Sequence, residues 1–195
     1  MTNSAGKVIS GKPVATGGVL SAPLGTAMPT SATGTIDAAF VPHGYVADDG
    51  VTKSESRETN DIKEWGGLTV KKSQTGFEAS FQFSFLEYLN AGAAKTIYGD
   101  SAVAVTAGNE THGEQIEVSV SGQEAPHRAW IFDMAEAGTK QKICIGDGQI
   151  TEVGDTTFST DGAAVRQVTL TAYPDDDGVL YRELTDDGVL VPSEP

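Results

Sequence analysis

The residues from 77 to 85 constrain the fold more than any other stretch, because hydrophobic and polar side chains alternate there without interruption. The hydrophobic positions are Phe77, Ala79, Phe81, Phe83 and Phe85. Successive side chains of a strand point to opposite faces, so this alternation places every aromatic ring on one face. We therefore predict a half-buried strand in which Phe77, Phe81, Phe83 and Phe85 face the core.

The next segment changes to helical spacing. The apolar residues that recur every three or four positions are Leu86, Leu89, Ala93 and Ile97. Gly99 then stands where a helix often ends, because glycine tolerates the left-handed conformation of that position. This pattern predicts one short α-helix over about 86–98, although Gly92 weakens it.

After this helix the chain returns to short, mostly apolar stretches. We expect strands at 102–106, 115–121, 128–134, 141–145, 149–153 and 166–173. The Asp147-Gly148 pair is predicted to form a hairpin turn between two of them. Short strands at this spacing, with a single helix, favour a mainly β domain built as an antiparallel sandwich or barrel.

Length and charge exclude several classes of protein. A chain of 195 residues is enough for one domain with a real hydrophobic core. Its 27 acidic and 13 basic residues give a net charge of −14, which argues against adhesion to nucleic acid, since phosphate binding requires clustered lysine and arginine. The single cysteine excludes an intrachain disulfide. No stretch predicts a signal peptide or a membrane span.

Two segments lie outside the strand pattern. Residues 1–35 are rich in Gly, Ser, Thr, Ala and Pro, so we expect a disordered tail or an extended arm that orders against something else. Residues 52–76 are the most charged stretch, and we expect a long polar hairpin or loop. The expected divisions are thus an N-terminal arm at 1–35, a β domain at 36–185 and a C-terminal tail at 186–195.

Residues capable of chemistry are scattered. The three histidines, which share no metal-ligand spacing, are His43, His112 and His127. Cys144 lies between two isoleucines and is expected to be a small buried hydrophobic residue. The sequence DDGV occurs at 48–51, 176–179 and 186–189, where the neighbouring oxygen ligands do not fit a calcium loop, so we predict turns. We expect no catalytic residue, no cofactor and no metal, and hence no enzyme.

Three stretches carry a resemblance to a known family. They are GGVLSAPLGTAMPT, GYVADDGVTKSESRETNDIKEWGG, and the phenylalanine alternation with the FLEYLN and AAKTIYGD that follow it. Together they resemble the major tail subunits, or tail tube proteins, of long-tailed bacteriophages, and most of all those of actinobacterial phages. The similarity extends over most of the chain and is strongest over about 17–100.

The resemblance implies a β-sandwich or barrel with a flanking helix that assembles into rings, usually hexameric. The rings stack into a tail tube, through which the phage DNA and the tape-measure protein pass. It further implies contacts with tail terminator and distal tail proteins, a place in the virion tail, and assembly in the host cytoplasm. DNA would pass without specific binding, which suits an acidic chain, and no membrane is involved.

The resemblance also assigns roles to the two unusual segments. It matches 52–76 to the family's long loop, which packs against the adjacent ring, and we expect this loop to be mobile in the free subunit. The N-terminal arm would be a second strap between subunits. The implied contact residues are Lys53, Arg57, Lys63, Trp65, Gly66, Gly67 and Lys71 in the loop, with Val19, Leu20 and Leu24 in the arm. The alternative for 52–76 is an ordinary surface hairpin with Trp65 in the subunit's own core.

Two other functions remain open. One is a β-sandwich module that binds carbohydrate or protein in a virion decoration or baseplate. It would need an exposed cluster of aromatic residues, yet these make up 7% of the chain and most follow the core alternation. The other is a hydrolase that uses paired aspartates, although no apolar surroundings are predicted that would raise the pKa of one of them.

Overall fold

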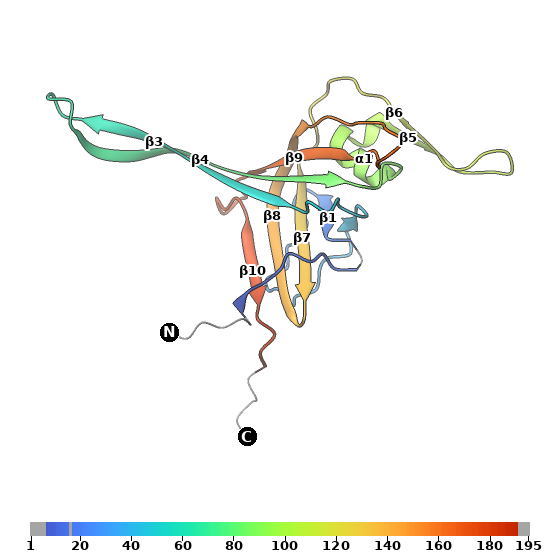
Figure 1. Ribbon diagram of the computed structural model, residues 1–195, viewed down its shortest axis with the longest axis horizontal. Coiled ribbons are helices and arrows are strands. Elements are labelled where there is room, and N and C mark those ends of the chain that lie inside the picture. The colour runs from blue at the N-terminus through green and yellow to red at the C-terminus, as the bar shows by residue number, and fades with distance from the viewer. Residues whose placement is uncertain (1–6, 16, 191–195) are drawn as a thin grey trace.

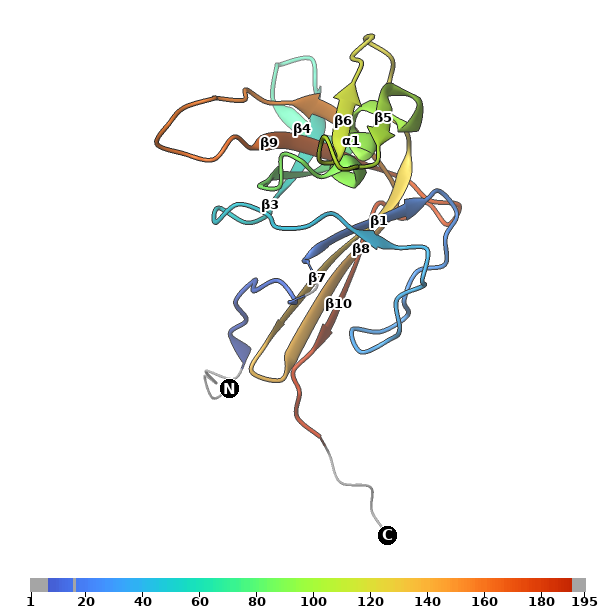
Figure 2. The same ribbon diagram turned by 90° about the vertical axis from the view of Figure 1, so that its right-hand side faces the viewer.

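The computed structural model describes residues 7–15 and 17–190, and it is mainly β (Figures 1 and 2). One antiparallel sheet contains eight strands, in the order β2-β1-β7-β8-β9-β4-β3, with β10 pairing to β8. A two-stranded ribbon, β5-β6, stands apart from it. The strands of the sheet are β1 (Val19–Pro23), β2 (Val41–Pro42), β3 (Thr52–Lys63), β4 (Thr69–Phe85), β7 (Arg128–Glu136), β8 (Thr139–Val153), β9 (Arg166–Tyr173) and β10 (Arg182–Asp186). The ribbon consists of β5 (Val103–Thr106) and β6 (Gln115–Val118).

The second half of β4 forms the centre of the core, as its alternation predicts. Phe81, Phe83 and Phe85 are buried. The sheet curves so that β4 faces β7, and the rings of Phe81 and Phe83 lie 5.3 and 5.5 Å from that of Phe132. Phe77 is only half-buried, so its assignment to the core is wrong: it lies beyond the last residue of β4 that pairs with β9.

The predicted turn at Asp147-Gly148 is wrong, because β8 runs through it without a break. The hairpin between β7 and β8 instead turns at Ala137 and Gly138, which both have positive φ. Gly148 has a packing role: a Cβ there would come within 3.0 Å of Cδ1 of Trp130. The indole Nε1 of Trp130 also donates a hydrogen bond to the carbonyl oxygen of Gly148 at 3.1 Å. The glycine therefore lets a buried ring lie against the strand.

The single α-helix, α1 (Ala91–Tyr98), is shorter than predicted. The side chain of Asn90 accepts a hydrogen bond from the backbone N–H of Ala93 at 3.1 Å, and this cap sets its start. Gly99, with φ of 89°, ends the helix as expected. The predicted start at 86 is wrong because the chain before Asn90 is not helical, and Leu89 is exposed there.

Much of the predicted N-terminal arm belongs to the subunit's own fold. β1 lies between β2 and β7, with Val19 in the main core and Leu20 and Ala22 packed on the opposite face. A run of consecutive apolar or small residues can bury both faces of such a short strand, which composition alone does not reveal. The description of 19–23 as an extended arm is therefore wrong. Residues 1–6 of that prediction, and 191–195 of the predicted C-terminal tail, lie outside the described residues.

The stretch at 52–76 is a hairpin, not an irregular loop, because β3 pairs with β4 from Thr52 to Lys63. Figure 1 shows that the hairpin projects far from the rest of the molecule, while α1, β5 and β6 lie at the opposite end. Among the described residues, no helix is long and apolar enough to cross a membrane.

Candidate assembly surfaces

The outer strand of the hairpin is a free sheet edge. β3 pairs only with β4 in the described part of the chain, and all twelve of its residues are exposed. An edge strand presents unpaired N–H and C=O groups that another chain can bind. Charged residues along β3 oppose uncontrolled pairing of this kind, so the edge favours a selective partner.

The base of the hairpin is fixed to the body through β10 and the residue before it. Lys53 Nζ forms an ion pair with Glu183 at 2.5 Å, and the hydroxyl of Tyr181 donates a hydrogen bond to Glu55. The hydrogen bond to Glu183 raises the pKa of Lys53 above its usual range. Lys53, one of the predicted contact residues, is therefore engaged within its own subunit.

Within the part of the chain that the structure describes, the cation–π contact and the ion pair in the middle of the hairpin join its two strands to each other. The guanidinium of Arg57 lies 4.8 Å from the centre of the Phe77 ring, and Lys72 pairs with Asp61 at 3.4 Å. The pairing register shifts between Glu58 and Thr59 and again between Ile62 and Lys63. Such irregularities bend a ribbon and increase its twist.

The tip presents a tryptophan to solvent on a defined turn. Glu64 N–H donates to the carbonyl of Leu68 at 2.9 Å, and Gly67 N–H donates back to the carbonyl of Glu64 at 2.9 Å. Gly67 has φ of 88°, as a three-residue hairpin loop requires. Trp65, in this loop, has a relative exposure of 104%, so the alternative that places it in the subunit's own core is wrong.

The structure separates the predicted contact residues into three places. Lys63, Trp65, Gly66, Gly67 and Lys71 gather at the tip and the strand ends beside it. Lys53 and Arg57 lie nearer the base. Val19 and Leu20 are buried at 1% and 8% exposure and so act as core residues, whereas Leu24 is exposed.

Sequence reasoning missed three exposed apolar residues near the tip, namely Ile62, Leu68 and Val70. Together with Trp65 they form what we call the tip cluster. The sequence does contain a signal for them, because large apolar side chains are unusual in an otherwise polar segment. Exposed apolar groups that gather in this way mark interaction sites more often than scattered ones.

Charge is divided unevenly between the hairpin and the body. Five of the 13 basic residues and four of the 27 acidic residues lie in 52–76, so this segment carries +1 and the remainder of the chain carries −15. An acidic surface therefore repels the hairpin less than it repels the remainder of the chain taken together. Electrostatic complementarity of this kind guides association and selects the orientation of partners.

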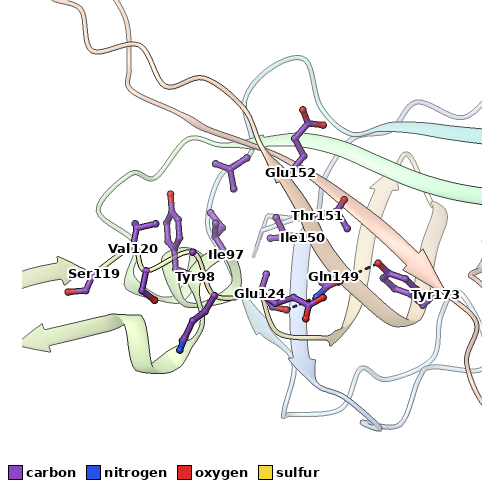
Figure 3. Close-up of a pocket in the computed structure, with 15 residues that line it drawn as sticks. Ile97, Tyr98, Ser119, Val120, Glu124, Gln149, Ile150, Thr151, Glu152 and Tyr173 are labelled. Carbon is purple, nitrogen blue, oxygen red and sulfur yellow. Dashed lines mark hydrogen bonds between the residues drawn. The ribbon is translucent and has the colours of Figure 1, made fainter.

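A cavity of about 420 Å³ opens beside the end of α1 (Figure 3). It is lined by Ile97 and Tyr98 of the helix, by the segment 119–125, by 149–153 of β8 and by Tyr173 of β9. Figure 3 shows Tyr98 and Ile97 between Val120 and Ile150, with Glu152 at the upper edge of the group and Glu124 in its middle, below Ile97. Its lining contains two carboxylates and no lysine or arginine.

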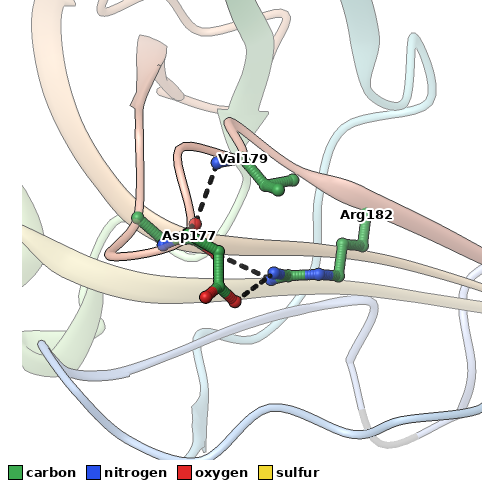
Figure 4. A network of polar contacts seen from close by, with 4 residues as sticks. Asp177, Val179 and Arg182 are labelled. Carbon is green, nitrogen blue, oxygen red and sulfur yellow. Dashed lines mark hydrogen bonds and ion pairs between the residues drawn. The ribbon is translucent and has the colours of Figure 1, made fainter.

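The first two DDGV sequences are turns, as predicted, whereas the third is not assigned as a turn. In the first two, Gly50 and Gly178 have φ of 69° and 77°, and each N–H donates to a carbonyl three residues earlier. In the second turn, Asp175 Oδ1 accepts the N–H of Val179 at 2.9 Å, and Arg182 pairs with Asp175 and Asp177 at 2.7 and 3.1 Å (Figure 4). The third follows the end of β10, and no strand resumes before residue 190. The carboxylates thus stabilise turns.

Other candidate groups are structural. Cys144 is buried, as predicted, and its burial raises the pKa of the thiol to about 11. His43 is also buried, with its Nε2 2.7 Å from Ser21 Oγ, and burial lowers its pKa to about 4. Within residues 7–15 and 17–190, no group of three His, Cys, Asp or Glu side chains could hold a metal ion.

Several solved structures share similarity with this chain at low sequence identity. The tube-terminating cap of the anti-feeding prophage is 12% identical, with 95% of this chain and 100% of that chain covered and a TM-score of 0.47. A chain of the native gene transfer agent virion is 14% identical, with 70% and 85% covered and a TM-score of 0.37. A chain of the empty gene transfer agent tail, refined with C6 symmetry, is 14% identical, with 78% and 87% covered and a TM-score of 0.39. No curated protein matches the chain in sequence.

A match to a family model covers nearly the whole sequence. Residues 1–193 match the model described as phage tail tube protein. This span includes the β domain, the projecting hairpin and the acidic turns. The chain therefore belongs to the phage tail tube protein family.

Proposed function

We propose that this protein is a structural subunit that forms rings, hexameric as is usual in its family, and that these rings stack into the tail tube of a phage virion. The observation that carries the proposal is the hairpin of β3 and β4, which projects from the body and ends in the exposed Trp65. An isolated two-stranded ribbon is marginally stable in water, so a hairpin of this length is suited to a partner that covers it. The open edge of β3 adds a backbone surface that ring closure or stacking would satisfy.

The net charge of −14 supports a passage for DNA rather than a binding site for it. DNA must slide through a tube, and a basic lumen would hold its phosphates. We propose that acidic side chains face this lumen. Reversing their charge should slow DNA ejection, and unchanged ejection would remove electrostatic repulsion from the mechanism.

The segment before β1 is proposed to serve as a strap to a neighbouring subunit. Its described part is tied to its own β7, since Val14 N–H donates to Asp133 O at 3.2 Å and Ala135 N–H donates to Lys12 O at 2.8 Å. The described part of the segment thus runs beside β7, with an isolated bridge between Pro13 and Met134. If deletion of residues 1–15 left assembly unchanged, this segment would have no such role.

Remaining partners follow from membership of the family. We propose contacts with tape-measure, tail terminator and distal tail proteins, relatives among actinobacterial phages, and assembly in the host cytoplasm before incorporation into the virion. The gene transfer agent tail is described with C6 symmetry, and we propose the same symmetry for this subunit on the grounds of family membership.

Negative-stain electron microscopy of the concentrated protein tests the central proposal. We expect rings or tubes with a central channel. A persistent monomer that binds glycans would instead favour a carbohydrate-binding module. Hydrogen exchange of the dilute subunit adds a second measurement: residues 57–72 should exchange rapidly in the monomer and become protected in the tube, because only contacts within the hairpin hold them.

A further inference from the structure

The turn at the tip of the hairpin fixes the backbone that carries Trp65. Two backbone hydrogen bonds close the turn, and the backbone N–H of Leu68 also reaches the carboxylate of Glu64 at 3.3 Å. A loop whose backbone is ordered before association loses less conformational freedom on binding. Buried tryptophans are also among the residues that contribute most to protein interfaces.

The cavity beside α1 has a mixed lining of polar and apolar side chains, which suits an indole ring with its apolar faces and single N–H donor. Its apolar lining comes from Ile97, Tyr98, Val120, Ile150 and Val153. Its volume of about 420 Å³ lies within the range of about 300–1,000 Å³ typical of pockets that enclose small molecules, so an indole ring has room to enter. Val120 is 68% exposed, which leaves apolar surface at the cavity uncovered.

The two surfaces are complementary in charge. Lys63 and Lys71 flank the turn at the tip, and neither is in an ion pair with another described residue. Glu124 and Glu152 border the cavity, and neither of them has an ion-pair partner within the described part of the chain. Free cations at one surface and free carboxylates at the other fix the orientation in which the two surfaces meet.

Trp65 cannot reach the cavity of its own chain, because the tip of the hairpin and α1 lie at opposite ends of the molecule (Figure 1). We propose that Trp65 of one copy inserts into the cavity between α1, 119–125 and β8 of a second copy, where Lys63 and Lys71 meet Glu124 and Glu152. This inference rests on the proposed function, and it names the receptor for the hairpin tip. A contact between two different surfaces repeats from copy to copy, and so it builds rings or extended stacks rather than a closed dimer.

Charge exchange between copies tests the pairing while keeping Trp65. One variant carries Lys63→Glu with Lys71→Glu, and the other carries Glu124→Lys with Glu152→Lys. Each alone sets like charges against one another, and we expect the concentration required for assembly to rise about tenfold or more at low salt. In an equal mixture every tip finds a cavity of opposite charge, so tubes should form again near the wild-type concentration.

A disulfide trap tests directly whether the tip of one copy lies close to the cavity of another. The double variant Leu68→Cys with Val120→Cys keeps Trp65 and should form a ladder of disulfide-linked multimers when assembled protein is oxidised, because Leu68 is an exposed residue at the tip. Reduction should collapse the ladder to monomer. The native Cys144 is buried and gives little background. A matched control is Leu68→Cys with Leu89→Cys, because Leu89 is 84% exposed but does not line the cavity.

The outcomes separate this inference from the proposed function. If wild-type protein forms tubes, but the mixed charge variants fail to assemble and the 68–120 pair fails to cross-link, the tip binds elsewhere and the inference is overturned. Cross-linking of the 68–89 control pair at the same rate would overturn it as well. If wild-type protein forms neither rings nor tubes, the proposed function fails and the inference fails with it.

Discussion

The two halves of β4 are one continuous strand with the same partner, β3, yet they have opposite environments. From Ala79 to Phe85 the strand also pairs with β9 and its aromatic residues are buried. From Thr69 to Glu78 it pairs with β3 alone and lies largely in solvent. The difference begins where β9 ends, so the third strand determines where the body stops and the hairpin begins.

This comparison shows that backbone pairing and burial contribute separately to the stability of a β-strand. Both halves have a ladder of hydrogen bonds, but only the inner half removes large apolar surface from water, which is the dominant favourable term in folding. The outer half is available for assembly because it has no part in the core. Substitutions in the two halves should therefore affect different properties of the protein.

Phe83→Ala in the inner half should have the largest effect on folding. Phe83 is 1% exposed and its ring lies 5.1 Å from that of Phe85, so its removal leaves a cavity in the core. We expect the free energy of unfolding to fall by about 3–5 kcal/mol, measured by urea denaturation of the dilute subunit. The matched control is Phe77→Ala in the outer half, where we expect a loss of about 1 kcal/mol. Equal losses would contradict the division of β4.

Acid should weaken the inner region through His43, whose ring lies 6.0 Å from those of both Phe85 and Trp130. Burial, and then the nearby Arg128, lower its pKa from 6.5 to about 4. Unfolded His43 thus gains a proton at higher pH than folded His43, so its contribution is complete above pH 6.5 and falls as the pH drops towards 4. Between pH 6.5 and pH 4 the free energy of unfolding should fall by about 3 kcal/mol on account of His43.

The measurement for His43 is the difference in stability between wild type and His43→Gln across this pH range, because carboxylates also titrate in acid. The wild type should lose stability more steeply than the variant from pH 6.5 downwards. Parallel curves would show that His43 contributes nothing to the acid sensitivity.

The sequence predicted the inner half of β4 better than the outer half, and for a physical reason. Alternating phenylalanines have one low-energy arrangement in a half-buried strand, and β9 was likewise predicted with its observed limits at 166 and 173. The outer half has no such constraint, so its composition allowed either a loop or a hairpin. The length and pairing of β3 depend on cross-strand contacts that composition does not encode.

The errors elsewhere also arise from tertiary contacts. Asp147-Gly148 has the composition of a turn, but Trp130 requires a glycine beside it within a strand. Residues 19–23 have the composition of an arm, but they pair with β7 and β2 and so form a strand of the sheet. Trp65 was identified as a contact candidate, whereas the cavity beside α1 combines four distant segments and no local pattern indicates it.

Tyr181→Phe should have a moderate, local effect at the boundary between the two halves. It removes the hydroxyl that donates to Glu55 but keeps the ring, which packs edge-on against Phe81 at 5.5 Å. Because the hydrogen bond is exposed, we expect a loss of about 1 kcal/mol or less in global stability. Hydrogen exchange should accelerate at 53–58, while the amides of β9 stay as protected as in wild type. Acceleration throughout the sheet would mean that the base of the hairpin belongs to the core.

Trp65→Ala should have the smallest effect on folding and a large one on assembly. The side chain is fully exposed in the free subunit, so the free energy of unfolding should change by less than about 0.5 kcal/mol. Truncation of a tryptophan at the centre of an interface costs about 2 kcal/mol or more, and each tube repeats the contact in every subunit, so tubes should no longer form at the wild-type concentration.

Tyr45→Ala is the control, since Tyr45 is an exposed aromatic residue outside both the hairpin and the cavity lining. Sedimentation and urea denaturation of the same preparations distinguish the two effects. A variant that assembles normally would show that the outer half of β4 projects for a reason other than the tip, and a variant that unfolds easily would show that the tip supports the subunit itself.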